Sequence, residues 1–517
     1  GPGSRFGNIP NNTYGIYNRA HPDGWKWFHH DNEHTLGTSQ SETNMVTPFT
    51  TAGSQWRYFN PHWQHERLAT QNADYRMHFA DHVYRHFFNG GLLTPDVSIA
   101  RIQRRAKEVE MAVIAESARW GDSKRSTPLT KQDWQNEINR IVNSYLPGRT
   151  GVVLNQFKST GWYPNVNPPT FDRQGGHVQP GSYLQISGSA GTLYYCLDGS
   201  DPRLPGGNVN TDRAKYYTAA IKLNASTHVK TRLYSSGTWS ALNEAVFAVG
   251  PVAQNLRISE VMYHPAETGN PDDPNTEFIE LTNIGSSTVN LNLVSFSNGV
   301  DFTFPSYDLA PGAYCLVVRD KAAFQAKYGS SLPVVGQYAG SLNNAGERIE
   351  LLDAAGTVIH DFHFEDDWFD VTDGLGFSLT VKDPKTTGVN GYNDKAFWRP
   401  SAKMGGSSGA ADSGQVPALG SAVINELLAN SGQESDWIEL RNTTSQAINI
   451  GGWYLSDDAN DLTKYTIGAG TSLPANGYLV FYENRHFGNK SDPGCKKEFG
   501  LRASGETVYL HSGSAGV

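Results

Sequence analysis

One seven-residue pattern occurs twice in this chain, and it constrains the fold more than any other feature. Residues 277–283 read Glu-Phe-Ile-Glu-Leu-Thr-Asn, and residues 436–442 read Asp-Trp-Ile-Glu-Leu-Arg-Asn. Each follows a short apolar segment that ends in a glutamate, Glu260 or Glu426. The remaining matched blocks, in the same order, are 309–314 with 473–478 and 346–351 with 505–510. Four matched blocks in one order predict a duplicated structural unit.

The repeated unit is predicted to be a β-sandwich. Period-2 geometry places Phe278 and Glu280 on one side of their strand, and Ile279 and Leu281 on the other. Short apolar runs separated by Gly, Pro, Asn and Asp turns indicate a sandwich or a barrel. The order of the four blocks resembles the lamin-tail domain, which implies an immunoglobulin-like sandwich. We assign 252–412 to the first copy, with an insertion between Asp361 and Ser407, and 421–517 to the second.

Amphipathic helices are predicted near the N-terminus. Apolar residues recur four apart within residues 74–89, and Thr94-Pro95 is an N-cap followed by proline at the first helical position. Thr130 with Asp133 predicts a capping box for a further helix. We expect helix to end at Pro147-Gly148 and β-structure to begin at Gly151.

A second resemblance concerns residues 151–251. The run Tyr194-Tyr195-Cys196-Leu197-Asp198-Gly199-Ser200-Asp201-Pro202-Arg203 enters an Asp-Gly turn. It is similar to the signature of the fibronectin-like domain that ends chitobiase-type enzymes. The resemblance implies a third immunoglobulin-like sandwich.

The N-terminal segment offers a candidate metal site by resemblance. Residues 11–17 and 25–36, with Asp23-Gly24 as a hairpin turn between them, resemble the C-terminal half of the CotH kinase family. That resemblance implies Asn12 and Asp31 as ligands of a Mg²⁺ ion bound to ATP. The nucleotide-gripping Lys and Glu of the family would lie upstream of residue 1, and its catalytic Asp is not seen. We therefore predict no ordered Mg²⁺ or nucleotide here, no catalytic residue in this chain, and a scaffold hydrogen bond from Asp31 to backbone amides or to Arg57 or Arg119.

Other candidate sites lie in the repeats. Oxygen-rich loops that would suit Ca²⁺ occur at 272–275 and at 457–461, although turns demand the same residue types. Trp437 and Trp453 are candidate binding aromatics, which we expect to be exposed. Glu280 and Glu439 recur with the fold, so a structural role is favoured over glycosidase chemistry.

The predicted fold class is a multidomain, mainly β protein with a small α-helical N-terminal block followed by three immunoglobulin-like sandwiches. Gly1–Ser4 resembles a scar left by tag removal. We expect residues 1–4 to be that scar and residues 5–150 to be the kinase-like remnant. The three sandwiches are expected at 151–251, 252–412 and 421–517, with a linker at 413–420 between the last two. The Gly- and Ser-rich stretch 405–414 supports that linker.

Bulk properties limit the partners. The net charge of −9 argues against nucleic acid, and no apolar run is long enough to span a bilayer. We expect a secreted or cell-surface protein whose modules bind an extracellular protein or polysaccharide, without a cofactor. The alternatives are the C-terminal part of a secreted Mg²⁺-dependent phosphotransferase and a set of carbohydrate-binding modules.

Overall fold

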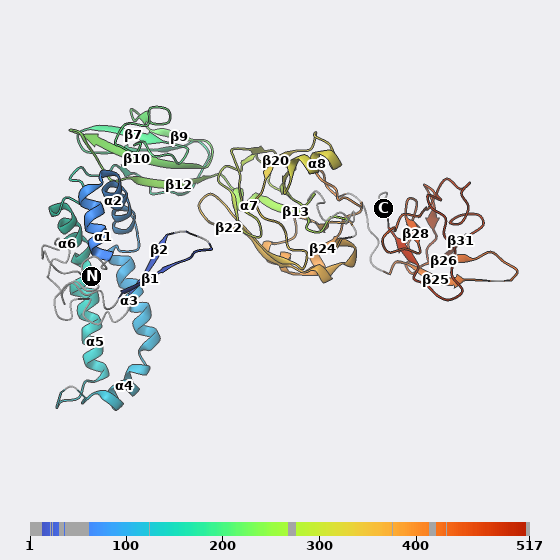
Figure 1. Ribbon diagram of the computed structural model, residues 1–517, viewed down its shortest axis with the longest axis horizontal. Coiled ribbons are helices and arrows are strands. Elements are labelled where there is room, and N and C mark those ends of the chain that lie inside the picture. Colours follow the sequence, from blue (N-terminus) through green and yellow to red (C-terminus); the bar gives the residue numbers. More distant parts are fainter. Residues whose placement is uncertain are drawn as a thin grey trace. The chain divides into compact units, whose positions relative to one another are not determined.

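The computed structural model describes residues 13–20, 22, 24–29, 36, 61–123, 125–266, 276–374, 376–412, 420–430 and 432–512. The chain divides into two compact units (Figure 1). The first consists of Gly1–Gly176, Gly181–Leu223 and Thr227–Phe247, and the second of His177–Pro180, Asn224–Ser226 and Ala248–Val517. The first unit contains the N-terminal hairpin, the N-terminal helical block and one sandwich. The second unit contains both copies of the repeat. The described part of the chain is mostly β, as the sequence predicts.

The N-terminal strands form the expected hairpin. Strands β1 (Thr13–Tyr17) and β2 (Trp25–His29) pair antiparallel, with Tyr17 opposite Trp25. Gly24 lies at the turn with φ +92°, a conformation that glycine adopts without a Cβ penalty.

The helical block has the predicted starts. Its elements are α1 (Pro61–Gln71), α2 (Ala73–Phe87), α3 (Pro95–Val109), α4 (Ala112–Trp120), α5 (Lys131–Arg140), a π-helical turn η2 (Ile141–Tyr145) and α6 (Leu146–Ser159). Pro95 occupies the first turn of α3, and Thr130 and Asp133 form the capping box that begins α5. The side chain of Asn72 caps α2 by accepting hydrogen bonds from the N–H groups of Asp74 and Tyr75. No described helix is long and apolar enough to cross a membrane.

The predicted end of the helical block was wrong. Helix α6 runs from Leu146 to Ser159, so Gly148 and Gly151 are helical and the boundary at 150 falls inside a helix. Pro147 directly follows the π-helical turn η2, and Tyr145 and Leu146 keep helical dihedral angles. The chain therefore stays helical from α5 through η2 into α6, at a place where the sequence was interpreted as ending a helix.

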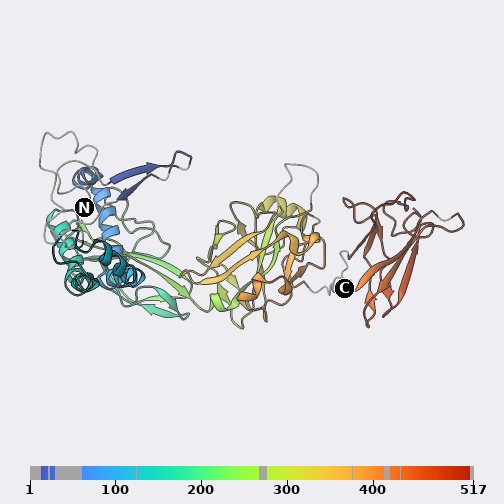
Figure 2. The same cartoon turned by 90° about the horizontal axis from the view of Figure 1, so that it is seen from below.

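The first sandwich packs against the helices. Its main sheet has the order β4 (Gly176–Val178), β12 (Asn243–Val249), β10 (Thr227–Ser235), β7 (Thr192–Cys196), β8 (Lys215–Tyr216), with β11 (Thr238–Trp239) on β10. Two small sheets pair β3 (Thr170–Phe171) with β6 (Ile186–Ser187), and β5 (Ser182–Leu184) with β9 (Ile221–Leu223). Ala241 of the sandwich shares a core cluster with Val83 and Tyr84 of α2. Figures 1 and 2 show the helices beside the sheet of β7, β10 and β12.

The first copy of the repeat is a two-layer sandwich. One sheet has the order β20 (Val334–Gln337), β19 (Tyr314–Val318), β14 (Phe278–Asn283), β13 (Leu256–Met262), β23 (Leu379–Val381), β24 (Trp398–Pro400). The other has the order β17 (Phe302–Thr303), β16 (Ser295–Asn298), β21 (Glu347–Leu352), β22 (Val358–Phe364), and β15 (Val289–Asn290) pairs with β18 (Asp308–Leu309). The helices are α7 (Val252–Asn255), α8 (Lys321–Tyr328) and the 3₁₀ turns η3 (Asp366–Trp368), η4 (Asp370–Thr372), η5 (Val389–Asn393) and η6 (Lys395–Phe397).

The second copy repeats this plan with fewer elements. One sheet has the order β25 (Ala422–Leu428), β26 (Trp437–Asn442), β31 (Tyr478–Tyr482). A second sheet has the order β29 (Tyr465–Thr466), β28 (Tyr454–Ser456), β32 (Tyr509–His511). A third, small sheet pairs β27 (Ile448–Asn449) with β30 (Ser472–Leu473). In the described part of this copy, nothing corresponds to α8, β23 or β24.

The matched asparagines hold equivalent turns. The Nδ2 group of Asn283 donates to the carbonyl oxygens of Ser287 and Leu309, at 2.9 and 2.8 Å. That of Asn442 donates to Gln446 and Leu473, at 2.7 and 3.1 Å. Both side chains are buried, so each bond ties the end of the repeated strand to two other segments.

Candidate functional site

The sequence-predicted metal ligands Asn12 and Asp31 lie outside the described residues, as does the acidic loop at 272–275. Their roles stay predictions. Within the described part of the chain, no group of three or more His, Cys, Asp or Glu side chains is placed to hold a metal ion.

In the second acidic loop, at 457–461, a lysine side chain pairs with the carboxylates. The ammonium group of Lys464 lies 2.5 Å from an oxygen of Asp457 and 3.7 Å from one of Asp458. Burial alone would lower the pKa of Lys464, but its hydrogen bond to Asp457 and the nearby carboxylates raise it. The lysine therefore supplies the positive charge that a calcium ion would bring to this loop, and calcium stays an untested prediction.

The expectation that Trp453 is an exposed binding residue was wrong. Only 4% of Trp453 is exposed, and the indole belongs to the core of the second copy with Ile450, Leu455 and Ile467. A large apolar ring directly before β28 stabilises the sandwich because it is removed from water. Trp437 is half-buried, and it stays a candidate.

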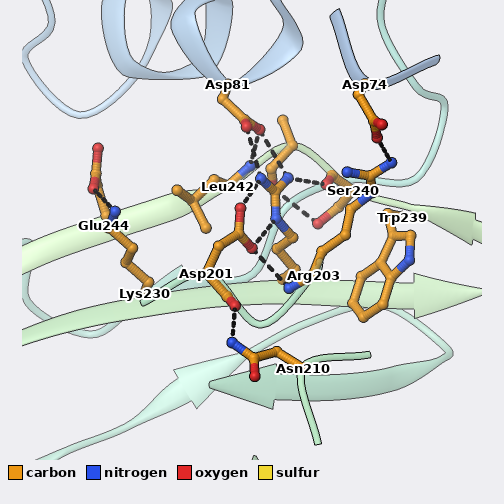
Figure 3. A network of polar contacts seen from close by, with 12 residues as sticks. Asp74, Asp81, Asp201, Arg203, Asn210, Lys230, Trp239, Ser240, Leu242 and Glu244 are labelled. Carbon is orange, nitrogen blue, oxygen red and sulfur yellow. Dashed lines mark hydrogen bonds and ion pairs between the residues drawn. The ribbon is translucent and has the colours of Figure 1, made fainter. Parts of the chain in front are cut away.

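Asp81 of α2 and Asp201 of the first sandwich, both labelled in Figure 3, meet at one buried arginine, Arg232. Arg232, on β10, is 1% exposed and makes two-pronged contacts with Asp81 of α2 and with Asp201 of the Gly-Ser-Asp-Pro-Arg run. Its fifth N–H donates to the carbonyl oxygen of Ser240 at 2.9 Å. Burial alone would lower the pKa of Arg232, but the hydrogen bonds to Asp201 and Asp81 raise it. All five guanidinium donors are used within the protein, so this cluster joins helix to sandwich and leaves no donor for a ligand.

Neighbouring ion pairs add further contacts between the helical block and the first sandwich. Arg203 contacts Asp74, which also accepts from the N–H of Gly206 at 3.0 Å. Glu244 on β12 contacts Arg85 of α2 as well as His228 and Lys230 of β10. The hydrogen bond from His228, together with these cations, lowers the pKa of Glu244 to about 2. The carboxylate is therefore charged at neutral pH, and it holds α2 against the sheet.

A pair of glutamates lies at the centre of the first copy. Glu260 of β13 and Glu280 of β14 are opposite each other in register, next to a β-bulge at Ser259. They are 0% and 1% exposed. Burial is the main cause that raises the pKa of both groups, and the proximity of Glu260 adds to the effect on Glu280. Burial and the neighbouring carboxyl group therefore both favour the protonated form of Glu280.

The insertion seals this pair. Ser378 donates to Oε1 of Glu260, and the N–H and Oγ of Ser407 reach its two oxygens at 2.9 and 2.7 Å. The N–H of Gly409 donates to Oε2 of Glu280 at 2.6 Å. A Cβ on Gly406 would lie 2.1 Å from Oε1 of Glu260, so only glycine fits there. Residues 405–412, at the end of the range predicted for the first copy, thus form a lid over the pair, although their Gly- and Ser-rich composition is typical of a linker. No substrate reaches a carboxyl pair closed in this way, which supports its structural role.

The second copy carries the same pair, and among the described residues no lid covers it. Glu426 and Glu439 face each other in register, with a bulge at Asn425 in the equivalent place. Asn425 Nδ2 donates to Oε1 of Glu439 at 2.7 Å, as the Ser259 hydroxyl does to Glu280 at 2.7 Å. Glu426 is exposed and Glu439 is half-buried. Both copies therefore contain the glutamate pair, but the exposure of the pair differs between them.

Comparisons with known proteins identify the repeat. A family model described as the Lamin Tail Domain matches residues 250–366 and 415–516. The two copies are lamin tail domains. A second model, described as Fn3 associated, matches residues 184–243 in the first sandwich. No curated protein matches the chain. A crystal structure of a DUF4876 family protein from Bacteroides thetaiotaomicron matches with 12% identity and a TM-score of 0.18, over 40% of this chain and 85% of that chain.

These matches support the resemblances to the lamin-tail and fibronectin-like domains. The two matching models cover the sandwiches and leave the helical block and the hairpin unmatched. The resemblance to the CotH kinase family therefore stays a prediction, and the phosphotransferase alternative stays one with it.

The two lamin tail domains differ in the face that carries the glutamates. In the first domain, Phe278 and its neighbours on this face lie under Phe324 and Tyr328 of α8. In the second domain the corresponding rows are Leu428–Trp437–Tyr482, Glu426–Glu439–Val480 and Val423–Arg441–Tyr478. We call these nine residues the open face, because none of them is buried.

The open face combines aromatic and charged groups. The guanidinium of Arg441 lies 5.6 Å from the ring centre of Tyr478, and that of Arg485 lies 5.2 Å from the ring centre of Tyr482. Trp437 lies between Leu428 and Tyr482 in register. Sequence reasoning singled out Trp437 and both members of each glutamate pair but did not bring the glutamates together. The pairing depends on a bulge that turns Glu260 and Glu426 toward the outer side, and no local pattern in the sequence predicts it.

Proposed function

We propose that this chain is a non-catalytic extracellular protein that binds or assembles with other macromolecules through its second lamin tail domain. One observation carries the proposal. In the first domain helix α8 packs over one face of the sheet, and in the second domain no described helix covers the corresponding face. A sheet face that carries partly exposed aromatic and charged side chains is suited to binding.

The composition of the open face supports binding. Tyr, Trp and Arg are the residue types that dominate contact energies at protein interfaces, and the face presents Trp437, Tyr478, Tyr482 and Arg441 around two carboxylates. Aromatic rings on a flat sheet also stack on sugars. The partner class is therefore an extracellular protein, with a polysaccharide as the other outcome of the test.

The experiment measures retention of the full chain on two kinds of matrix. One kind carries insoluble polysaccharides such as chitin and cellulose, and the other carries immobilised proteins secreted by the source organism. We expect Trp437→Ala to abolish retention on the matrix that binds the wild type. Tyr183→Ala is the matched control, because Tyr183 is an aromatic residue 63% exposed on β5 of the first sandwich.

Two results would overturn the proposal. Equal retention of the wild type and Trp437→Ala would remove the open face as the contact surface. Phosphoryl transfer from Mg²⁺-ATP by the purified chain would replace binding with catalysis as the leading function.

A further inference from the structure

We infer that His78 and His82 of helix α2 form a binding site for one divalent transition-metal ion of the zinc type, which their two Nε2 atoms ligate together. The site lies in the helical block of the first unit. It goes beyond the proposed function, because it uses no residue of the open face. It is also separate from the predicted Mg²⁺ ligands Asn12 and Asp31, which are oxygen donors.

Three histidines follow one another along α2 at a spacing of four residues. They are His78, His82 and His86. Residues four apart on a helix are neighbours on its surface. Two histidines at this spacing are the arrangement by which one helix supplies two imidazole ligands to zinc. His78 and His82 are exposed, and His86 is half-buried. An ion can therefore reach the first two side chains from solvent.

The first two imidazoles stand at the separation that one ion requires. The Nε2 atoms of His78 and His82 lie 3.1 Å apart. Two nitrogens that each lie about 2.0 to 2.1 Å from one ion are about 2.9 Å apart at a right angle and about 3.3 Å apart at the tetrahedral angle. The observed separation falls between these limits. The ring planes are perpendicular, with centres 4.6 Å apart, and because both rings are exposed they can turn to direct both lone pairs to the ion.

The third histidine does not join the pair. The ring centre of His86 lies 6.2 Å from that of His82, and the two planes are stacked at 22°. The lone pairs of an imidazole lie in its ring plane, so two stacked rings do not direct them to one point. This agrees with the finding that no three described His, Cys, Asp or Glu side chains are placed to hold a metal ion. The ion therefore has two protein ligands, and water fills its remaining positions.

The charges around the pair are compatible with a bound cation. Partial burial is the main cause that lowers the pKa of His82, and the positive charges of Arg85 and of the two other histidines add to it, whereas Asp81 opposes it. His82 is therefore neutral at neutral pH, which is the form that ligates a metal. The charge of Arg85 is offset by its ion pair with Glu244 of β12.

The donor set selects the class of ion. Imidazole nitrogen suits Zn²⁺, Cu²⁺ and Ni²⁺, whereas Mg²⁺ and Ca²⁺ prefer oxygen ligands. Asp81, a carboxylate of the same helix, is already bound by both terminal nitrogens of Arg232. The pair therefore offers nitrogen without a neighbouring oxygen ligand, and we expect it to discriminate against Mg²⁺ and Ca²⁺.

The experiment titrates ZnCl₂ into the full chain, freed of any histidine tag, in an isothermal titration calorimeter. The chain contains 16 histidines, so the site is assigned by a difference in stoichiometry. We expect His78→Ala and His82→Ala each to lose one zinc equivalent, because a single imidazole does not chelate. His86→Ala is the matched control, since it removes the same side chain one turn further along α2, and it should keep that equivalent. Excess Mg²⁺ or Ca²⁺ should not displace the zinc.

Hydrogen exchange gives a second readout. An ion that binds only the folded helix stabilises it, so Zn²⁺ should slow the exchange of the α2 amides in the wild type and not in His78→Ala. Labelling of Cys196, which is buried on β7, checks that each variant is folded. If an alanine variant is not, His78→Gln and His82→Gln replace it, because they keep a polar side chain of similar size.

Three results would overturn the inference. The first is the same zinc stoichiometry in the wild type and in the variants of His78 and His82. The second is an equal loss in His86→Ala, which would mean that the helix binds zinc through all its histidines without a defined pair. The third is one ion for two chains, seen as a zinc-dependent dimer in sedimentation, because the remaining ligands would then come from a second copy.

Discussion

Glu280 and Glu439 occupy the same place in two copies of one motif, and their surroundings differ. Glu280 is enclosed by Ser259, Gly409 and the neighbouring carboxyl group of Glu260, whereas Glu439 is half-buried beside Asn425. Desolvation makes a buried carboxylate costly unless donors or a proton compensate it. The same residue type is thus a sealed structural group in one domain and an accessible acceptor in the other.

The raised pKa of Glu280 predicts a pH dependence of stability. A carboxyl group whose pKa is higher in the folded protein binds more protons when folded, so the free energy of unfolding falls as pH rises. The window begins at the ordinary carboxyl pKa, about 4.5, and extends up to the raised value. We expect the first lamin tail domain to be more stable at pH 5.5 than at pH 8, as measured by hydrogen exchange of β14 in urea.

Glu280→Gln should flatten this dependence, because the amide does not titrate. Glu439→Gln serves as the control at the equivalent position of the second domain, and it should leave the pH profile of the first domain unchanged. An unchanged profile after Glu280→Gln would show that the dependence arises elsewhere.

Equivalent strands of the two copies differ in burial, and helix α2 is fixed to its sandwich by ion pairs. Strand β14 is buried on both faces, while β26 alternates between core and the open face. Helix α2 is held to the first sandwich by Arg232 and by the contacts of Glu244 with Arg85. Removing one partner of the buried Arg232–Asp81 pair would be strongly destabilising, because the other charge would be left buried.

Arg232→Ala should therefore destabilise the first unit by about 3 to 5 kcal/mol. Arg105→Ala is the control, since Arg105 is 77% exposed and pairs with Glu108 on the same helix; its effect should stay within about 0.5 kcal/mol. Thiol labelling of Cys196, which is buried on β7 next to β10, measures the change. If Arg232→Ala reduced stability as little as the control does, the cluster around Arg232 would not be what holds the helix to the sandwich.

Across the whole molecule, each copy of the repeat has its own core. Leu281 belongs to a cluster of the first lamin tail domain and Leu440 to a cluster of the second, and both are 0% exposed. The two clusters share no residue. Duplication has therefore produced two separately packed domains.

Leu281→Ala and Leu440→Ala should each cost about 2 to 5 kcal/mol in the domain that carries the change. The double variant should show the sum of the two losses, because residues in separate cores do not couple. Labelling of Cys315, buried in the first domain, and hydrogen exchange of β26 in the second report the two domains separately. A coupling well beyond about 0.5 kcal/mol would contradict separate cores.

Much of the fold was predictable because it depends on local rules. The capping box at Thr130, the hairpin at Gly24 and the period-2 pattern around Leu281 each require only neighbouring residues. The candidate site was less predictable. Trp453 faces inward, and the helical stretch continues past Pro147 after a π-helical turn. In both cases the residue type alone allows either outcome.

Local patterns in the sequence are enough to predict that one unit occurs twice, that it is a β-sandwich, and that a glutamate stands at the same position of each repeated strand. Which of those glutamates is accessible depends on contacts between distant parts of the chain. The reason is that residues 378–409 are distant in sequence from Glu260 and Glu280 but close in space, where they supply the hydrogen bonds that allow the carboxyl groups to be buried. A repeated motif fixes the local geometry of a strand, whereas burial depends on what the rest of the chain places over it.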